Sequence, residues 1–310
     1  SMEDMADRRQ AAEAFTGAKL EEIAVGGMSP ETASKNIENM IGTVQIPLGY
    51  AGPVHMEGGE AEGDFLVPLA TTEGALVASI SRGMSVINDG GGVRARVFGD
   101  AMTRAPVFRV NGIAHCAEVM SWIDSHRAEI DEAVSSTTSH GKLVRIEPFP
   151  AGRNLFLRFS FETGDAMGMN MATIASEAVG RLIEKETGAV MVSVSGNMCS
   201  DKKPAAINLI EGRGKTVVAE ALIPRDIVEK RLHTTSDAVV EINYRKNLVG
   251  SSLAGTLGAN AHAANMVAAF FIATGQDPAQ VVGGSMAMTT CEDIDGDLYI
   301  SVRMPVVEVG

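Results

Sequence analysis

The middle third of the chain alternates short apolar strands with amphipathic helices, and this alternation constrains the fold more than any other feature. β-branched and aromatic residues predict strands at 107–110, 155–161 and 190–194. Helical spacing of apolar residues predicts helices at 117–135 and 167–186. Elements in this order fit a small α+β unit, and the longer flanking segments predict a larger domain into which this unit is inserted.

The flanking segments predict a second set of elements. They are a helical N-terminal arm, strands at 43–53, 65–68, 216–223 and 297–309, and helices at 71–88, from 224 and at 260–274. Thr71 or Thr72 is expected to cap the helix that ends near Asn88. Gly275 is expected to end the helix at 260–274, since Pro278 prevents its continuation.

The composition bounds the partners of the chain. With 310 residues and 45% hydrophobic content, the chain can bury a large core and is expected to form more than one domain. The net charge of -13 argues against nucleic acid or an anionic membrane as a partner. The longest apolar run, 266–273, is far shorter than the roughly 20 residues of a membrane helix. Three scattered cysteines predict neither a disulfide framework nor a zinc site, so we expect a reduced cytoplasmic setting.

Two adjacent lysines stand beside a carboxylate in Asp201-Lys202-Lys203-Pro204. The chain has only nine lysines, so a pair in a Gly/Ser/Asn-rich loop is unusual. In a partly desolvated site, one ammonium could stabilise a developing oxyanion while Asp201 keeps it charged. A solvated basic turn that ends at Pro204 explains the same residues, so this segment alone leaves both interpretations open.

Five further motifs surround the lysine loop in order. They are Glu38-Asn39-Met40-Ile41-Gly42, Ala70-Thr71-Thr72-Glu73-Gly74, Asp165-Ala166-Met167-Gly168-Met169-Asn170, Asn247-Leu248-Val249-Gly250-Ser251 and Gly275-Gln276-Asp277. With the lysine loop they closely resemble the catalytic portion of 3-hydroxy-3-methylglutaryl-coenzyme A (HMG-CoA) reductases, over positions 38–310. The Thr71-Thr72-Glu73-Gly74 form resembles the biosynthetic, class I type, because the degradative type carries a Glu-Glu-Pro version.

This resemblance implies an α+β fold with a large mixed α/β substrate-binding domain around a central helix and an inserted small ferredoxin-like, non-Rossmann cofactor domain. It places a helical arm at 1–37, the large domain at 38–105 and 194–310, and the small domain at 106–193. It also implies reduction of HMG-CoA to mevalonate and coenzyme A, a step of isoprenoid biosynthesis, by two hydride transfers from NADPH rather than NADH and without a metal. The family architecture implies a homodimer in which the lysine loop reaches Glu73 and Asp277 of the partner subunit.

The resemblance also assigns roles to individual residues. Lys202 stabilises the oxygen anion, Glu73 protonates the carbonyl oxygen, and Asp277 joins both in a hydrogen-bonded network. Small apolar neighbours predict that Glu73 is a buried carboxyl with a raised pKa, whereas its expected place in a first helical turn favours the charged form. Arg104 matches the clamp for the distal carboxylate of the HMG group. The other residues at substrate-site positions are Ser195, Asp201, Lys203, Lys246 and Asn265. His262 is expected to be a core histidine near the site.

The nicotinamide cofactor is expected at the start of the helix at 167–186, where free backbone N–H groups can take a pyrophosphate. By resemblance, Gly168, Met169 and Asn170 lie nearest the cofactor, while Asp165 caps the helix or contacts a ribose. Contacts to the 2′-phosphate fall near Ser139-His140-Gly141, where the family's usual arginine is absent.

A function of a different class stays open. The family's C-terminal catalytic histidine has no match among the six histidines, so the chain could be a non-catalytic acyl-CoA-binding or regulatory homologue. We expect instead a longer polypeptide that carries this histidine on a segment beyond Gly310. Gly214-Lys215-Thr216 ends like a phosphate-binding loop, but Leu209 occupies the position of its first glycine.

Overall fold

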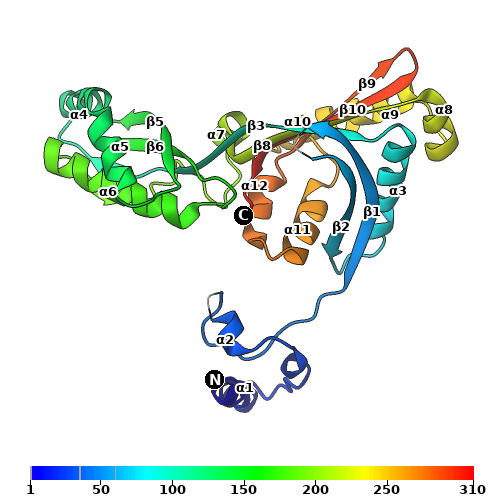
Figure 1. The fold of residues 1–310 in the computed structure, drawn as a ribbon, viewed down its shortest axis with the longest axis horizontal. Coiled ribbons are helices and arrows are strands. Elements are labelled where there is room, and N and C mark those ends of the chain that lie inside the picture. Colours follow the sequence, from blue (N-terminus) through cyan, green and yellow to red (C-terminus); the bar gives the residue numbers. More distant parts are fainter. Residues whose placement is uncertain (1, 35, 60) are drawn as a thin grey trace. The chain divides into compact units, whose positions relative to one another are not determined.

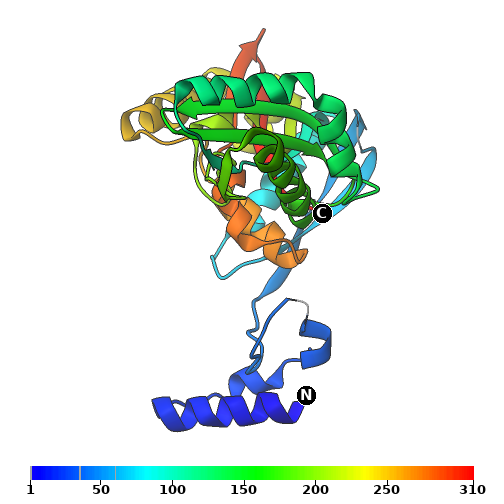
Figure 2. The same cartoon turned by 90° about the vertical axis from the view of Figure 1, so that its left-hand side faces the viewer.

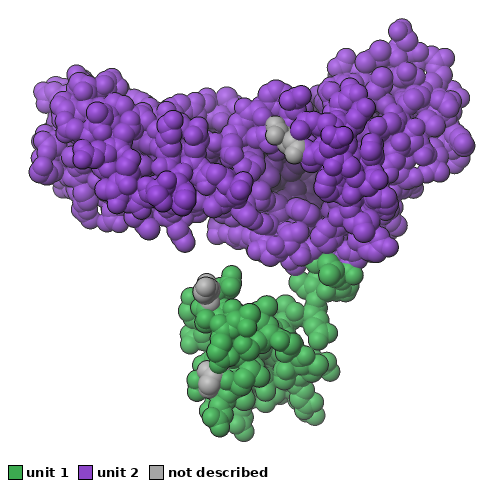
Figure 3. All heavy atoms as spheres, viewed as in Figure 1, with its two compact units in different colours: residues 1–48, 70–73 green, residues 49–69, 74–310 purple. Residues whose placement is uncertain are grey.

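The structure is a computed structural model that describes residues 2–34, 36–59 and 61–310. Its contacts divide the chain into two compact units, coloured separately in Figure 3: Ser1–Leu48 with Ala70–Glu73, and Gly49–Leu69 with Gly74–Gly310. Within the described ranges, no helix combines the length and apolar character needed to cross a membrane.

The secondary structure mixes helices and strands throughout the second unit (Figure 1). The helices are α1 (Met2–Thr16), α2 (Pro30–Ala33), α3 (Leu76–Asp89), α4 (Ile113–Ser125), α5 (Arg127–Ser135), α6 (Met169–Thr187), α7 (Ala206–Glu211), α8 (Arg225–Ile227), α9 (Ser236–Ile242), α10 (Ser251–Ala254), α11 (Ala263–Ala273) and α12 (Val281–Gly284). Short 3₁₀ or π-helical segments are η1 (Glu22–Val25), η2 (Val228–Leu232), η3 (Asn243–Gly250) and η4 (Pro278–Gln280). The strands are β1 (Leu48–Gly59), β2 (Gly63–Ala70), β3 (Val93–Arg104), β4 (Val107–Arg109), β5 (Lys142–Ala151), β6 (Asn154–Glu162), β7 (Val190–Ser193), β8 (Arg213–Ile223), β9 (Met288–Ile294) and β10 (Asp297–Val307).

In the first unit, a small apolar cluster holds the N-terminal helices together. Met5, Ala33 and Met40 are its buried members. The Arg8 guanidinium donates a hydrogen bond of 3.0 Å to the carbonyl of Met40, which ties α1 to the irregular segment around Met40. The predicted arm is therefore helical, although α1 ends at Thr16.

The strands of the second unit pair in the order β7-β4-β6-β3-β8-β10-β9, with β1 beside β3, β2 beside β1 and β5 beside β6. The strand β3 connects the two halves of this sheet. Ala95 pairs with Ala219 of β8, whereas Arg104 at the other end pairs with Phe159 of β6. Figure 1 shows β3 running between these two parts of the sheet. The register shifts near Gly99, between these two pairings. β3 therefore pairs with β8 over most of its length and with β6 at its end, which places Arg104 beside β6.

The segment from β4 to β7 builds one core, and Figure 2 brings this part of the chain to the front. Its strands lie in the order β7-β4-β6-β5. Alternate residues of β6 point to opposite faces of the sheet. Leu155, Leu157, Phe159 and Phe161 pack into one cluster with apolar side chains of α4, α5 and α6, so the three helices cover the same face. The intervening Arg158 is fully buried on the other face, where it donates to the Gly212 carbonyl at 3.0 Å.

The start of α3 differs from the prediction. The helix begins at Leu76, and neither predicted threonine caps it, because the Thr71 hydroxyl instead accepts a hydrogen bond of 3.0 Å from the backbone N–H of Glu73. Ala75 takes a left-handed conformation just before the helix. Glu73 therefore lies in a turn rather than in a first helical turn, and it is exposed rather than buried.

Candidate active site

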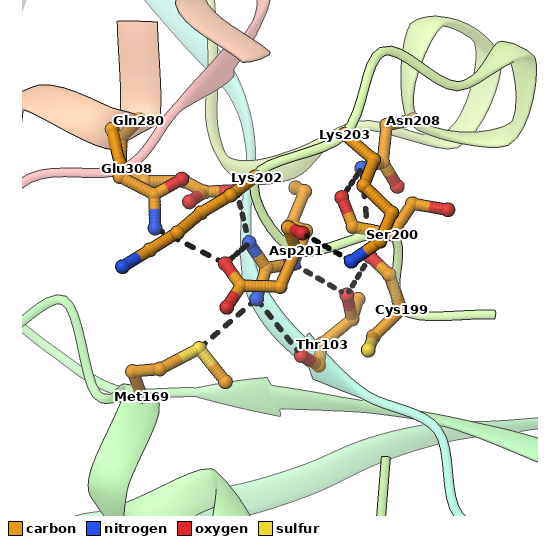
Figure 4. A network of polar contacts seen from close by, with 12 residues as sticks. Thr103, Met169, Cys199, Ser200, Asp201, Lys202, Lys203, Asn208, Gln280 and Glu308 are labelled. Atoms are coloured by element: carbon orange, nitrogen blue, oxygen red, sulfur yellow. Dashed lines mark hydrogen bonds and ion pairs between the residues drawn. The ribbon is translucent and has the colours of Figure 1, made fainter. Parts of the chain in front are cut away.

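The lysine loop lies between β7 and α7, and its backbone is unusually constrained. Asn197, Ser200 and Lys202 have φ angles of 65°, 51° and 56°. Non-glycine residues adopt this left-handed region rarely and persist there when the surrounding structure determines the conformation. The buried Asn208 of α7 provides part of this support, because its amide donates to the Ser200 carbonyl at 3.1 Å (Figure 4).

The loop presents Lys202 to Asp277 of the same chain. The Lys202 ammonium lies 2.7 Å from Asp277 Oδ2. Asp277 Oδ1 accepts from the backbone N–H of Ala279 at 3.1 Å, so the first turn of η4 fixes the carboxylate. The expectation that Lys202 reaches Asp277 across a subunit interface is wrong for this contact, because η4 of the same chain folds back against the loop.

This ion pair raises the pKa of Lys202. The hydrogen bond with Asp277 is the main cause, with further contributions from the charges of Asp277, Asp201 and Glu308, while partial burial acts in the opposite direction. Both side chains are partly exposed, at 45% and 35%, and exposed pairs of this kind add about 0–1 kcal/mol to stability. The pair therefore keeps a charged, oriented ammonium at the surface and contributes little to folding.

Arg213 fixes the position of the Asp201 carboxylate by an ion pair. The Arg213 Nη1 group donates to Asp201 Oδ1 at 2.9 Å, and the Gln280 amide donates to the same oxygen at 3.1 Å. Partial burial alone would raise the pKa of Asp201, but the Arg213 charge, these hydrogen bonds and the Lys202 charge lower it. Lys203 folds back on the loop, since its ammonium donates to the Asp201 carbonyl at 3.1 Å.

Arg104 stands at the end of β3 beside the first turns of α6. Its Nε and Nη2 groups both donate to the Thr173 hydroxyl, at 2.9 and 2.7 Å, and that hydroxyl donates to the Met169 carbonyl at 2.8 Å. Arg104 forms no ion pair within the described residues. Its half-buried charge therefore faces a neutral hydroxyl, where a carboxylate ligand would bind more strongly.

The predicted cofactor residues gather at the N-terminus of α6. Gly168 precedes the helix with a φ of 77°, and a Cβ atom there would lie 2.2 Å from Cγ2 of Thr163. Gly141 packs against the same turn, because a Cβ on it would lie 1.9 Å from the sulfur of Met171. The structure thus brings Gly141, the last residue of the predicted Ser139-His140-Gly141 segment, against Met171 in the first turn of α6. The expectation that Asp165 caps the helix is wrong, since no side chain caps it and Gly168 occupies the N-cap.

The remaining predicted residues lie on other elements. Lys246 is exposed on the π-helical η3, and its ammonium forms no hydrogen bond or ion pair in the described part of the chain. Asn265 is half-buried on α11, and Ser195 begins the lysine loop, with its hydroxyl 3.5 Å from the Cys199 sulfur. His262 is exposed at the N-cap of α11, so the expectation of a core histidine is wrong: the helix starts one residue later, at the buried Ala263.

Sequence reasoning missed the charged residues that the fold buries, of which Arg213 and Glu308 lie next to the lysine loop and Arg158 lies on β6. For Arg213 and for Glu308, the neighbouring sequence contains a feature that could have indicated a buried charge. Arg213 is flanked by Gly212 and Gly214, whose φ angles of 76° and 66° let the backbone turn tightly at the start of β8. Glu308 is a single acid in the apolar run 306–309. A lone charge in such a run is expected to have a buried partner of opposite sign.

Comparisons with known proteins identify the same family that the sequence motifs resemble. A sequence model of the hydroxymethylglutaryl-coenzyme A reductase family matches residues 4–310. The chain is 55% identical over 303 residues to the 3-hydroxy-3-methylglutaryl-coenzyme A reductase of Haloferax volcanii, covering 98% of this chain and 75% of that protein. It is 53% identical over 307 residues to the reductase of Pyrococcus horikoshii, covering 98% and 74%.

Among solved structures, the chain resembles the class II reductase of Streptococcus pneumoniae bound to NADPH in open conformations. The TM-score is 0.70 at 18% identity, and the match covers 96% of this chain and 83% of that one. This likeness extends to the fold, whereas the sequence relatives share about half of all residues over nearly the whole chain. The chain belongs to the hydroxymethylglutaryl-coenzyme A reductase family.

Proposed function

We propose that the protein reduces HMG-CoA to mevalonate and coenzyme A in two NADPH-dependent steps. The observation that carries this proposal is the Lys202 ammonium, held 2.7 Å from Asp277 on a left-handed loop residue. A positively charged donor fixed in this way suits an oxygen anion that develops during reduction of a thioester. The family assignment supplies the reaction, and the geometry supports Lys202 as the residue that stabilises its charge.

Different residues have different roles in the proposed reaction. The nicotinamide cofactor supplies hydride when bound. Lys202 stabilises the oxygen anion that forms on the substrate, and Glu73 donates the proton that neutralises it. Arg104 binds the distal carboxylate of the HMG group. Ser195, Asp201, Lys203, Lys246 and Asn265 are proposed to bind other parts of the substrate.

The N-terminus of α6 fits the pyrophosphate of a nicotinamide cofactor. Its first turn contains no acidic residue, so the free N–H groups and the helix dipole favour an anion there. The close packing of Gly168 on Thr163 holds the backbone at this point. We propose Met169 and Asn170 as pyrophosphate contacts, Asp165 as a ribose contact and Ser139 as a contact to the 2′-phosphate, with NADPH preferred over NADH.

The architecture of the β4–β7 segment supports a separate cofactor domain at 106–193. The chain order of one strand, helices, two strands, a helix and one strand, with the strand order β7-β4-β6-β5, is that of a ferredoxin-like unit. Its core cluster draws all its buried members from positions 102–189. We propose that 38–105 and 194–310 form the substrate domain, and that the enzyme is a homodimer in which Glu73 serves the lysine loop of the partner subunit.

We assign the protein to the class I type. The Thr71-Thr72-Glu73-Gly74 motif supports this assignment.

The assay that tests the function follows NADPH absorbance with HMG-CoA as substrate and measures the mevalonate formed. Two molecules of NADPH consumed for each mevalonate are expected. Tight HMG-CoA binding by calorimetry without NADPH oxidation would instead favour the non-catalytic acyl-CoA-binding homologue.

Arg104→Ala is expected to raise the dissociation constant for HMG-CoA by about tenfold or more, because a charge-assisted hydrogen bond is worth about 1.5–3 kcal/mol. NADPH affinity is expected to change much less. Calorimetry with each ligand measures both constants. Arg109→Ala is the matched control, since Arg109 is an exposed arginine on β4, the next strand along the chain. Equal losses for both ligands in Arg104→Ala would contradict the clamp.

Gly168→Ala is expected to lower stability and NADPH affinity more than Gly164→Ala. Both glycines have left-handed φ angles, 77° and 64°, so both variants incur the roughly 1–2 kcal/mol cost of a side chain in that region. Only the Gly168 variant also drives its Cβ into the Thr163 side chain, since nothing lies within 4 Å of a Cβ at Gly164. Thermal unfolding and NADPH titration compare the two. Equal effects would show that Thr163 moves aside and that Gly168 is not required.

A further inference from the structure

The buried guanidinium of Arg213 lies where four segments of the candidate site meet. Its Nη1 group donates to Asp201 at 2.9 Å and also to Glu308. Its Nε group donates to the Thr103 hydroxyl at 3.0 Å, and Nη2 lies 3.0 Å from the Met169 sulfur. Figure 4 shows Asp201, Glu308, Thr103 and Met169 converging around this point.

Three of these contacts are next to residues of the proposed mechanism. Asp201 precedes Lys202, Thr103 precedes Arg104, and Met169 is the first residue of α6. We infer that Arg213 is a positioning residue that fixes the lysine loop, the Arg104 end of β3 and the first turn of α6 relative to one another. This inference rests on the proposed function, and it adds a residue that touches neither substrate nor cofactor.

Glu308 holds Arg213 in this position. It is 2% exposed, and its Oε2 atom has no hydrogen-bond partner in the described part of the chain. Burial raises the pKa of Glu308, and the charge and hydrogen bond of Arg213 oppose this increase. A buried ion pair rarely stabilises a fold more than apolar side chains of similar size would. The buried ion pair between Arg213 and Glu308 is therefore better explained by the positions it imposes on neighbouring residues than by a gain in stability.

The arrangement requires an arginine. A guanidinium has five N–H donors in a rigid planar fork, which lets Arg213 reach two carboxylates, a hydroxyl and a sulfur at once. A lysine ammonium is a single point charge on a flexible stem and serves fewer partners in fixed directions. Arg213→Lys thus keeps the charge and removes the geometry.

Two variants test the inference, with one matched control. Arg213→Lys is expected to lower kcat by at least roughly tenfold, because a displacement of about 1 Å at a catalytic group costs on the order of a hundredfold. Hydrogen exchange of the amides at 196–204, measured without ligands, is expected to become faster. Glu308→Gln is expected to change both quantities in the same direction. The control is Glu147→Gln, which removes the carboxylate partner of the other fully buried arginine, Arg158, at 3.0 Å.

A double variant separates positioning from general destabilisation. If Arg213 acts through Lys202, adding Arg213→Lys to Lys202→Met is expected to cause little further loss of kcat, whereas independent effects would multiply. A folded Arg213→Lys protein with wild-type kcat and wild-type exchange at 196–204 would overturn the inference. If that variant does not fold, Glu308→Gln decides, and behaviour equal to that of Glu147→Gln overturns it. The exchange measurement needs no substrate, so it remains decisive even if the wild-type protein fails to oxidise NADPH with HMG-CoA.

Discussion

Lys202→Met is expected to lower kcat for HMG-CoA reduction by roughly a hundredfold to a thousandfold, the usual effect of removing one donor to a developing oxyanion. Methionine keeps most of the length and volume of the side chain but removes the charge that lies 2.7 Å from Asp277. The pair is partly exposed, so its loss should leave the fold and the thermal unfolding temperature nearly unchanged. Steady-state kinetics and thermal unfolding measure the two effects.

The control for this variant is Lys215→Met, which removes another ion-paired lysine. Lys215 contacts Asp100 at 2.5 Å on the β3–β8 side of the sheet and has no proposed part in the reaction. Near-wild-type turnover of Lys202→Met would reject the central assignment and return the lysine loop to the alternative of a solvated basic turn. A loss of similar size in both variants would point to a general effect of removing lysine charge.

Glu73→Gln is expected to lower kcat by roughly a hundredfold to ten-thousandfold, because a positioned general acid contributes that much to a proton-transfer step. Glutamine has the shape of glutamate but cannot donate the proton that neutralises the oxygen anion. HMG-CoA affinity is expected to stay close to that of the wild-type protein, since a group used only in the transition state affects kcat without a matching effect on binding. Steady-state kinetics measure kcat, and calorimetry measures the affinity for HMG-CoA.

Glu21→Gln is a suitable control for this prediction. Glu21 is an exposed carboxylate in the same compact unit as Glu73, so the substitution repeats the chemical change outside the proposed site. If HMG-CoA affinity collapses in Glu73→Gln while turnover at saturating substrate survives, Glu73 is a binding residue and another group supplies the proton.

Elements that depend on local pattern and on burial in a single core could be predicted from the sequence. The helix predicted at 167–186 is observed as α6 at Met169–Thr187, and the strand predicted at 155–161 is observed as β6 at Asn154–Glu162. The alternating C-terminal segment predicted at 297–309 forms β10 at Asp297–Val307. In each case one face or one alternate set of residues is apolar, so the periodicity itself encodes the direction of burial.

Other elements carry no such local pattern. β3 follows three consecutive glycines, contains two arginines in its first half and shifts register near Gly99, so it does not read as a strand in isolation. β5 contains Pro148 and Pro150, which cannot donate backbone hydrogen bonds. The strand tolerates these prolines because it is an edge strand that pairs with β6 on one side, so it needs fewer backbone donors. Neighbouring strands therefore decide that these two segments are strands.

The sequence by itself determined the residue types of the site: a lysine pair with a carboxylate, an arginine before a strand break, and glycines at a helix start. Only the tertiary structure decided which of these groups meet. Gln280 reaches Asp201 across 79 positions, and Arg213 reaches Glu308 across 95. No local periodicity encodes such contacts, because a buried charge is stable only where distant segments bring its partners within hydrogen-bond distance. The folded sheet supplies that proximity by placing β8, β10 and the lysine loop around one guanidinium.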